Sequence, residues 1–137
     1  KVRSWRGSIM IKKILLVDDE EVILNTYASL LGERGFAVVT ATCGRKALEE
    51  FFSHSFDLVI TDLAMSDIDG FTVIEEVKKV SPGTPVIAFT AKCYKNVKEY
   101  VFLLGASALL EKTCSIDTFI TNVNNSLLNG PKASTAI

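Results

Sequence analysis

Short apolar runs alternate with helix-like patterns along most of the chain. Runs of three or four mostly apolar residues, rich in leucine and β-branched side chains, predict strands buried on both faces of a sheet. They lie at residues 14–17, 37–40, 58–61, 86–89 and 108–110. The intervening segments carry apolar residues three or four positions apart, which predicts amphipathic helices. These lie at about residues 20–34, 45–54, 71–77, 96–104 and 116–128.

This alternation predicts an α/β fold. Strand–helix–strand units build a parallel sheet through right-handed crossovers, with helices on both faces. For five strands we expect a (βα)5 doubly wound parallel sheet, flavodoxin-like, with strand order 2-1-3-4-5. The residues expected to face the sheet are Val22, Ile23, Tyr27, Leu30 and Leu31 in the first helix, and Ala47, Leu48, Phe51 and Phe52 in the second.

A single domain accounts for the patterned sequence. We assign it to residues 10–129, which are enough to bury a core without disulfides. Residues 1–9 are basic and have no period, so we interpret them as a cloning remnant or a linker, with Met10 as the native start. Residues 130–137 open on Gly130-Pro131 and are expected to form a short C-terminal tail.

Composition and charge argue against several classes of protein. The formal net charge of −1 gives no electrostatic reason to expect nucleic acid or a membrane surface as a partner of this domain. Cys43, Cys93 and Cys114 include no Cys-x-x-Cys pair, which favours free thiols in a reducing compartment. The longest apolar run, residues 100–110, is about half the length of a membrane span. With no secretory signal pattern, we expect a cytoplasmic protein.

Polar residues gather where the predicted strands end. Asp18 and Asp19 follow the first strand, Asp62 the third, Thr90 the fourth and Lys112 the fifth. In an open α/β sheet, ligands bind outside the carboxyl ends of the strands, where the strand order reverses. Here that point falls between the first and third strands. We therefore expect the three aspartates to flank one crevice, with Thr90 and Lys112 along its far side.

The chemistry of this group points to phosphoryl transfer. Neighbouring carboxylates repel one another, so the three aspartates need protons, a cation or both. Oxygen ligands at an open edge suit Mg²⁺, or Mn²⁺ in its place. Asp62 could then attack a phosphoryl group as a carboxylate nucleophile, giving an acyl phosphate. Thr90 and Lys112 would donate hydrogen bonds to that phosphate.

Four segments taken in order share the pattern of a known family. They are Ile14–Glu20, Asp62–Met65 with Gly70, Pro85–Ala91, and Leu104–Ala106 with Glu111-Lys112. The pattern resembles that of response-regulator receiver domains. The first segment is similar to their first strand and acidic pair, and the second to their phosphoacceptor loop. The third and fourth segments are similar to their fourth and fifth strands. The resemblance extends over residues 10–128, and the four motifs together make it specific.

The resemblance implies a signalling phosphoacceptor and not an enzyme, limited to self-catalysed phosphotransfer and dephosphorylation. It implies Mg²⁺ dependence and a sensor histidine kinase or histidine phosphotransfer protein as the donor. The metal ligands would be Asp19, Asp62 and the backbone carbonyl of Ala64, with Asp18 nearby or acting through water. The last two helices and the fifth strand would contact a downstream effector or a second copy of the chain.

Three positions depart from the family pattern. Ser66 and Thr113 stand where the family usually has proline, after the loop methionine and after the active-site lysine, and Leu109 replaces an aromatic residue that usually moves with the threonine. They favour an alternative, a phosphorylation-independent receiver-like interaction module. Because Thr113 is not proline, we expect the Lys112–Thr113 peptide bond to be trans.

Other polar residues fit simpler roles. Asp67 and Asp69 suit helix caps or turns, and His54 suits the C-terminal end of a helix. A group of lysines is interpreted first as a solvated helix face and second as a partner surface. These are Lys92, Lys95 and Lys98. A flavodoxin-type cofactor site is disfavoured, because Asp18-Asp19-Glu20 would repel the cofactor's phosphate.

Overall fold

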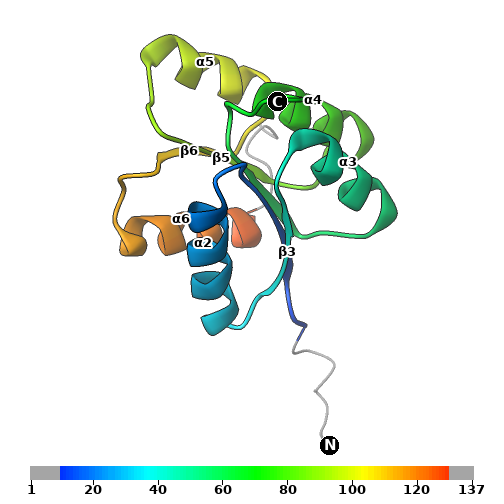
Figure 1. Cartoon of the computed structure of the whole chain (residues 1–137), viewed down its shortest axis with the longest axis vertical. Coiled ribbons are helices and arrows are strands. Elements are labelled where there is room, and N and C mark those ends of the chain that lie inside the picture. The colour runs from blue at the N-terminus through cyan, green and yellow to red at the C-terminus, as the bar shows by residue number, and fades with distance from the viewer. Residues whose placement is uncertain (1–9, 130–137) are drawn as a thin grey trace, which may run out of the picture.

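The computed structural model describes residues 10–129, which form one parallel sheet between two layers of helices (Figure 1). The strands are β2 (Lys13–Val17), β3 (Ala37–Ala41), β4 (Leu58–Thr61), β5 (Val86–Thr90) and β6 (Ala108–Glu111). The helices are α2 (Glu21–Glu33), α3 (Gly44–Ser53), α4 (Gly70–Val80), α5 (Lys95–Leu103) and α6 (Ile116–Asn129). The strand order is β3-β2-β4-β5-β6, which confirms the predicted 2-1-3-4-5 topology.

The register of the sheet brings the strand ends to one edge. All four strand pairs are parallel, and the last residue of β2, Val17, is paired with both Ala41 of β3 and Thr61 of β4. At the other side of the sheet Thr90 is paired with Glu111. The polar residues that follow these strands therefore emerge from the same edge, as the sequence predicts.

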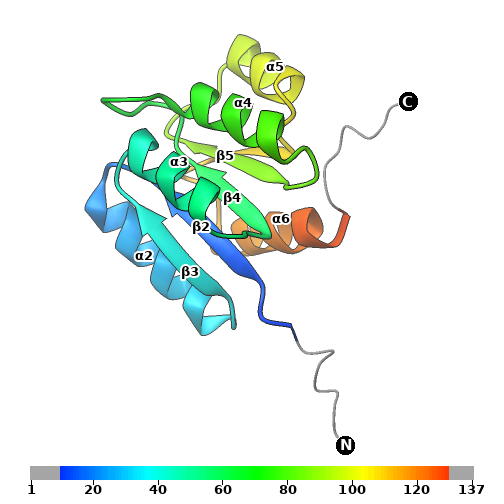
Figure 2. The same ribbon diagram turned by 90° about the vertical axis from the view of Figure 1, so that its right-hand side faces the viewer.

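The core has two halves, one on each face of the sheet. Helices α3, α4 and α5 cover one face, and α2 and α6 cover the other (Figures 1 and 2). Alternate residues of β2 divide between them: Leu15 and Val17 face the α3–α5 side, whereas Ile14 and Leu16 face the α2–α6 side. Because the strands are buried on both faces, they are apolar at nearly every position, which explains the runs in the sequence.

Two predicted core residues point outward. Val22 is 77 % exposed and Phe52 is 54 % exposed, so placing them on the buried faces was wrong. In α2 the buried positions are Leu24 and Leu31, and Val22 is turned by about 200° from Leu24 at 100° per residue. In α3 the buried stripe includes Ala47 and Phe51, one turn apart, and Phe52 lies beyond its edge.

The ends of the described chain lie at the opposite edge of the sheet from the polar strand ends. Strand β2 starts at Lys13 on that edge, and α6 runs back from the carboxyl end of β6 to finish there at Asn129 (Figure 2). Within residues 10–129, no helix combines the length and the apolar character required to cross a bilayer.

Candidate functional site

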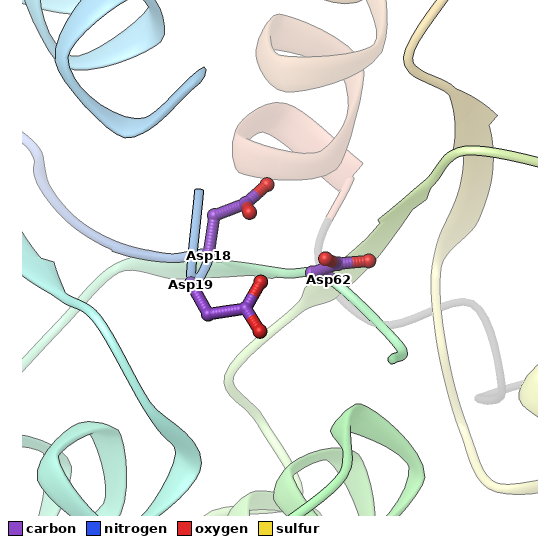
Figure 3. Close-up of side chains that lie close together, drawn as sticks. All are labelled: Asp18, Asp19 and Asp62. Atoms are coloured by element: carbon purple, nitrogen blue, oxygen red, sulfur yellow. The ribbon is translucent and has the colours of Figure 1, made fainter. Parts of the chain in front are cut away.

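Three aspartates meet at the carboxyl edge of the sheet. Asp18 and Asp19 follow β2, and Asp62 follows the neighbouring strand β4. One carboxylate oxygen of each lies within 4.8 Å of those of the other two (Figure 3). Backbone hydrogen bonds fix the two strand ends: the Asp62 N–H donates to Val17, and the Asp18 N–H donates to Ala41.

Lys112 brings a positive charge into this cluster from β6. Its Nζ lies 2.8 Å from Asp18 Oδ2, 3.0 Å from Asp62 Oδ2 and 3.8 Å from Glu20 Oε1. The Lys112 N–H donates to the Thr90 carbonyl at 2.7 Å, so the lysine backbone is tied to the end of β5. No peptide bond between residues 10 and 129 is cis, and the expected trans Lys112–Thr113 bond is therefore confirmed.

Asp62 is buried and held by backbone hydrogen bonds. The residue is only 5 % exposed, and its Oδ1 accepts a 2.7 Å hydrogen bond from the Leu63 N–H and a longer one, 3.5 Å, from the Ala64 N–H. Burial raises the pKa of the Asp62 carboxyl above its usual range, and Lys112 offsets only part of this effect. Burial acts to lower the pKa of Lys112, but its contacts with Asp18 and Asp62 outweigh burial and raise it.

The donor set fits a hard divalent cation. Asp18 is only 1 % exposed, and its Oδ2 is paired with the Lys112 ammonium at 2.8 Å. Three carboxylates and one ammonium leave a formal charge of −2 when all are ionised, and oxygen-only ligands suit Mg²⁺.

The remaining predicted residues are also near the site. Thr90 is buried at the end of β5, beside Glu111 and Lys112 of the adjacent strand. Ala64 is exposed in the loop after Asp62, and its N–H points to the Asp62 carboxylate. The structure thus brings together the side chains of Asp18, Asp19, Asp62 and Lys112, and it joins Thr90 and Ala64 to them through backbone groups.

Three nearby acidic residues were not assigned a role at this site from the sequence. Glu20 approaches Lys112, and Glu111 accepts a 2.9 Å hydrogen bond from the Cys93 N–H in the loop after β5. Asp67 accepts hydrogen bonds from the first residues of α3. Only the role of Asp67 could have been inferred from the sequence. Helix α3 begins at Cys43-Gly44, where no side chain is a good N-cap, so a capping group from elsewhere in the chain is expected. By contrast, Asp69 caps its own helix α4 through the Thr72 N–H at 2.9 Å, as expected.

Comparisons with known proteins agree with this geometry. The family model described as the response regulator receiver domain matches residues 14–124. The response regulator SaeR of Staphylococcus epidermidis is 30% identical over 121 residues, which are 88% of this chain and 52% of SaeR. The chain therefore spans about half the length of the curated relatives it matches.

Solved structures show the same fold. A response regulator receiver domain protein from Clostridium thermocellum is 30% identical with a TM-score of 0.82, over 87% of this chain and 96% of that one. The response regulator TrrA of Thermotoga maritima, solved in complex with Mg²⁺ and BeF, is 33% identical with a TM-score of 0.77, over 84% of this chain and 98% of that one. With its sheet order, its strand-end aspartates and its family match, this chain belongs to the receiver domains of two-component response regulators.

Proposed function

We propose that Asp62 is the phosphoacceptor of this receiver domain. The observation that carries the proposal is the position of its buried carboxylate, which lies beside those of Asp18 and Asp19 and 3.0 Å from the Lys112 ammonium that also pairs with Asp18. In the transfer, a carboxylate oxygen of Asp62 forms a bond to phosphorus. The bond from phosphorus to the donor's nitrogen or oxygen breaks, and the donor keeps that electron pair. The product is an acyl phosphate on Asp62.

The residues around Asp62 have separate tasks in this proposal. Lys112 pairs with the carboxylate before transfer and donates to the phosphoryl oxygens afterwards. The Leu63 N–H holds Oδ1 and so fixes the plane of the nucleophile. Thr90 is assigned the second side-chain donor to the phosphate. The same groups would position water for the self-catalysed dephosphorylation.

A divalent metal, Mg²⁺ or Mn²⁺, would be held by Asp19, Asp62 and the Ala64 carbonyl, with Asp18 close by. When bound, it supplies positive charge that offsets the carboxylates and the incoming phosphoryl oxygens. The fit rests on the oxygen-only donor set, in which oxygens of the three aspartates lie within 4.8 Å of one another.

The proposed partners are a histidine kinase or a histidine phosphotransfer protein in the cytoplasm as donor, and an effector or a second copy that binds α5, α6 and β6. Receiver domains act as signalling switches, so transfer to Asp62 would alter these contacts. The phosphorylation-independent module proposed from Ser66, Leu109 and Thr113 is less well supported, because such a module has no need of a buried nucleophile paired with an ammonium.

The test is labelling with acetyl phosphate and Mg²⁺, followed by mass spectrometry of the intact protein. We expect one phosphoryl group on the wild type and none on Asp62→Asn, because an amide is not a nucleophile. Asp57→Asn is the matched control: Asp57 is an exposed aspartate just before the same strand, and within residues 10–129 its carboxylate accepts one hydrogen bond, from the Lys13 N–H.

Two results would contradict the assignment. Full labelling of Asp62→Asn would place the phosphoryl group on another residue. A wild type that stays unlabelled would support the interaction module instead. For the metal, Asp19→Ala should remove most of the Mg²⁺ affinity, and an unchanged titration would place the cation elsewhere.

A further inference from the structure

Asp67 connects two segments that are distant in the sequence. Its carboxylate accepts hydrogen bonds from the N–H groups of Gly44 and Arg45, each at 3.0 Å, across 23 and 22 residues. These are the first two residues of α3, and the side chain of the N-cap residue Cys43 does not cap the backbone of this helix. Asp67 therefore caps a helix to which it does not belong, and its negative charge lies at the positive end of that helix.

The two segments also fit closely as backbone against backbone. A Cβ on Gly44 would collide with the carbonyl oxygen of Ile68 and would lie 2.8 Å from the Ile68 Cβ. Ile68 in turn packs against the core half formed with α3, α4 and α5. The start of α3 and the end of the Asp67 loop are thus fitted to one another, and the carboxylate holds them in this arrangement.

The loop that Asp67 anchors is the one that surrounds Asp62. It contains the N–H groups of Leu63 and Ala64 that point to Asp62 Oδ1. Its far end is fixed to α4, where the Gly70 N–H donates to the Leu63 carbonyl at 2.9 Å. Ser66 lacks the ring that would fix φ, so this part of the loop depends on contacts made by its neighbours.

We propose that Asp67 is a positioning residue for the phosphoacceptor site, anchoring residues 63–66 to α3 so that the backbone around Asp62 keeps its arrangement. The inference rests on the proposed function of Asp62. Asp67 touches neither phosphoryl group nor metal, and it acts through the loop. The hydrogen bonds from Arg45, Ile68 and Gly44 also hold the pKa of Asp67 well below its usual range, so the anchor is charged at neutral pH.

The first test needs no metal and no phosphoryl donor. Amide hydrogen exchange is compared in metal-free buffer for the wild type, Asp67→Asn, Asp67→Ala and the control Asp57→Asn. We expect the Asp67 variants to exchange faster at Gly44, Arg45, Leu63 and Ala64, most strongly in Asp67→Ala. Faster exchange confined to Gly44 and Arg45 would overturn the proposal, because Asp67 would then be a helix cap and nothing more.

The second test measures Mg²⁺ titrations of the same proteins by amide chemical shifts. Loss of an outer-shell partner weakens metal sites about 10–100-fold, and for Asp67→Asn we expect the lower end, roughly tenfold. Asp57→Asn should titrate as the wild type does, even if it loses equal thermal stability. A titration of Asp67→Asn within twofold of the wild type would overturn the role at the site.

Labelling by acetyl phosphate separates this inference from the proposed function. If the wild type is labelled and Asp67→Asn is labelled more slowly at low Mg²⁺ but recovers at saturating Mg²⁺, both proposals hold. If the wild type remains unlabelled, the function of Asp62 fails. The exchange at Leu63 and Ala64 then still decides whether Asp67 anchors their backbone.

Discussion

The loops that follow β4 and β5 differ in how firmly they are held. The loop after β4, residues 62–69, is tied to α3 by Asp67 and to α4 by Asp69, and it enters a helix with buried residues along its length. The loop after β5, residues 91–94, is largely exposed and is linked to β6 by the hydrogen bond from Cys93 to Glu111. Its helix, α5, has Val101 as its fully buried residue.

This difference assigns separate tasks to the two sides of the site. The side that carries Asp62 is fixed before any phosphoryl group arrives, which favours catalysis because the nucleophile does not need to be ordered. On the other side, the loop after β5 and helix α5 make few contacts with the rest of the domain. A small gain in binding energy can therefore shift the balance between their conformations. Lys112 joins both sides, since its ammonium pairs with Asp62 and its N–H donates to Thr90.

The largest expected effect, on the rate of phosphoryl transfer, comes from removing the Lys112 ammonium. Lys112→Met should slow labelling by acetyl phosphate roughly 10²–10³-fold, the usual cost of losing one donor to the developing charge. Lys95→Met, at the exposed start of α5, is the control and should label at the wild-type rate. A rate for Lys112→Met within a few-fold of the wild type would show that the ammonium does not act in the transfer.

The fixed side can be disturbed directly at Gly70. A Cβ there would collide with the Asp62 carbonyl oxygen and lie 2.7 Å from the Leu63 Cα, both of them backbone atoms. Gly70→Ala should therefore lower the free energy of unfolding by about 1–3 kcal/mol. Gly32→Ala should instead stabilise by up to about 1 kcal/mol, since Gly32 is in α2 with nothing within 4 Å of its would-be Cβ. Urea unfolding measures both, and equal effects would argue against a tight β4–α4 junction.

A third prediction concerns pH and is smaller. The pKa of Asp62 is raised by burial above its ordinary value of 3.8, so the folded state binds this proton more tightly than the unfolded state does. The resulting stability is fully present below pH 3.8 and is lost as the pH rises through the folded-state pKa. In metal-free buffer, Asp62→Asn should therefore gain stability relative to the wild type as the pH rises toward neutrality. If the difference in stability between Asp62→Asn and the wild type did not change with pH, burial would not disfavour the ionised form of Asp62.

The smallest effect is expected in the loop after β5. Glu111→Gln removes a charged acceptor from an exposed hydrogen bond, so the free energy of unfolding should change by no more than about 0.5 kcal/mol. Exchange at the Cys93 amide should nevertheless become faster, and the shifts of residues 91–104 on adding beryllofluoride should increase. Unchanged exchange at Cys93 would indicate that this loop is held by contacts other than Glu111.

The sequence predicts the fold and the meeting of the polar strand ends at one edge of the sheet, because both follow from period and position. Strands buried on both faces produce apolar runs, and parallel strands bring their carboxyl ends to one edge. The buried faces of the helices were harder to predict. Val22 and Phe52 are apolar but lie beyond the buried stripe of their helices, and hydrophobicity alone does not show where that stripe ends. The Asp67 anchor was missed because it depends on a contact across 22 residues, which local spacing does not encode.

The chain ends described above have a practical consequence for attaching probes. Residues 13 and 129 lie at the amino edge of the sheet, and a five-residue strand separates that edge from Asp62 by about 17 Å. A fluorophore, an affinity handle or a surface tether attached at residue 13 or 129 therefore leaves the phosphoacceptor edge open. In a single-molecule assay, the domain could be held from both ends while a donor approaches Asp62 unhindered.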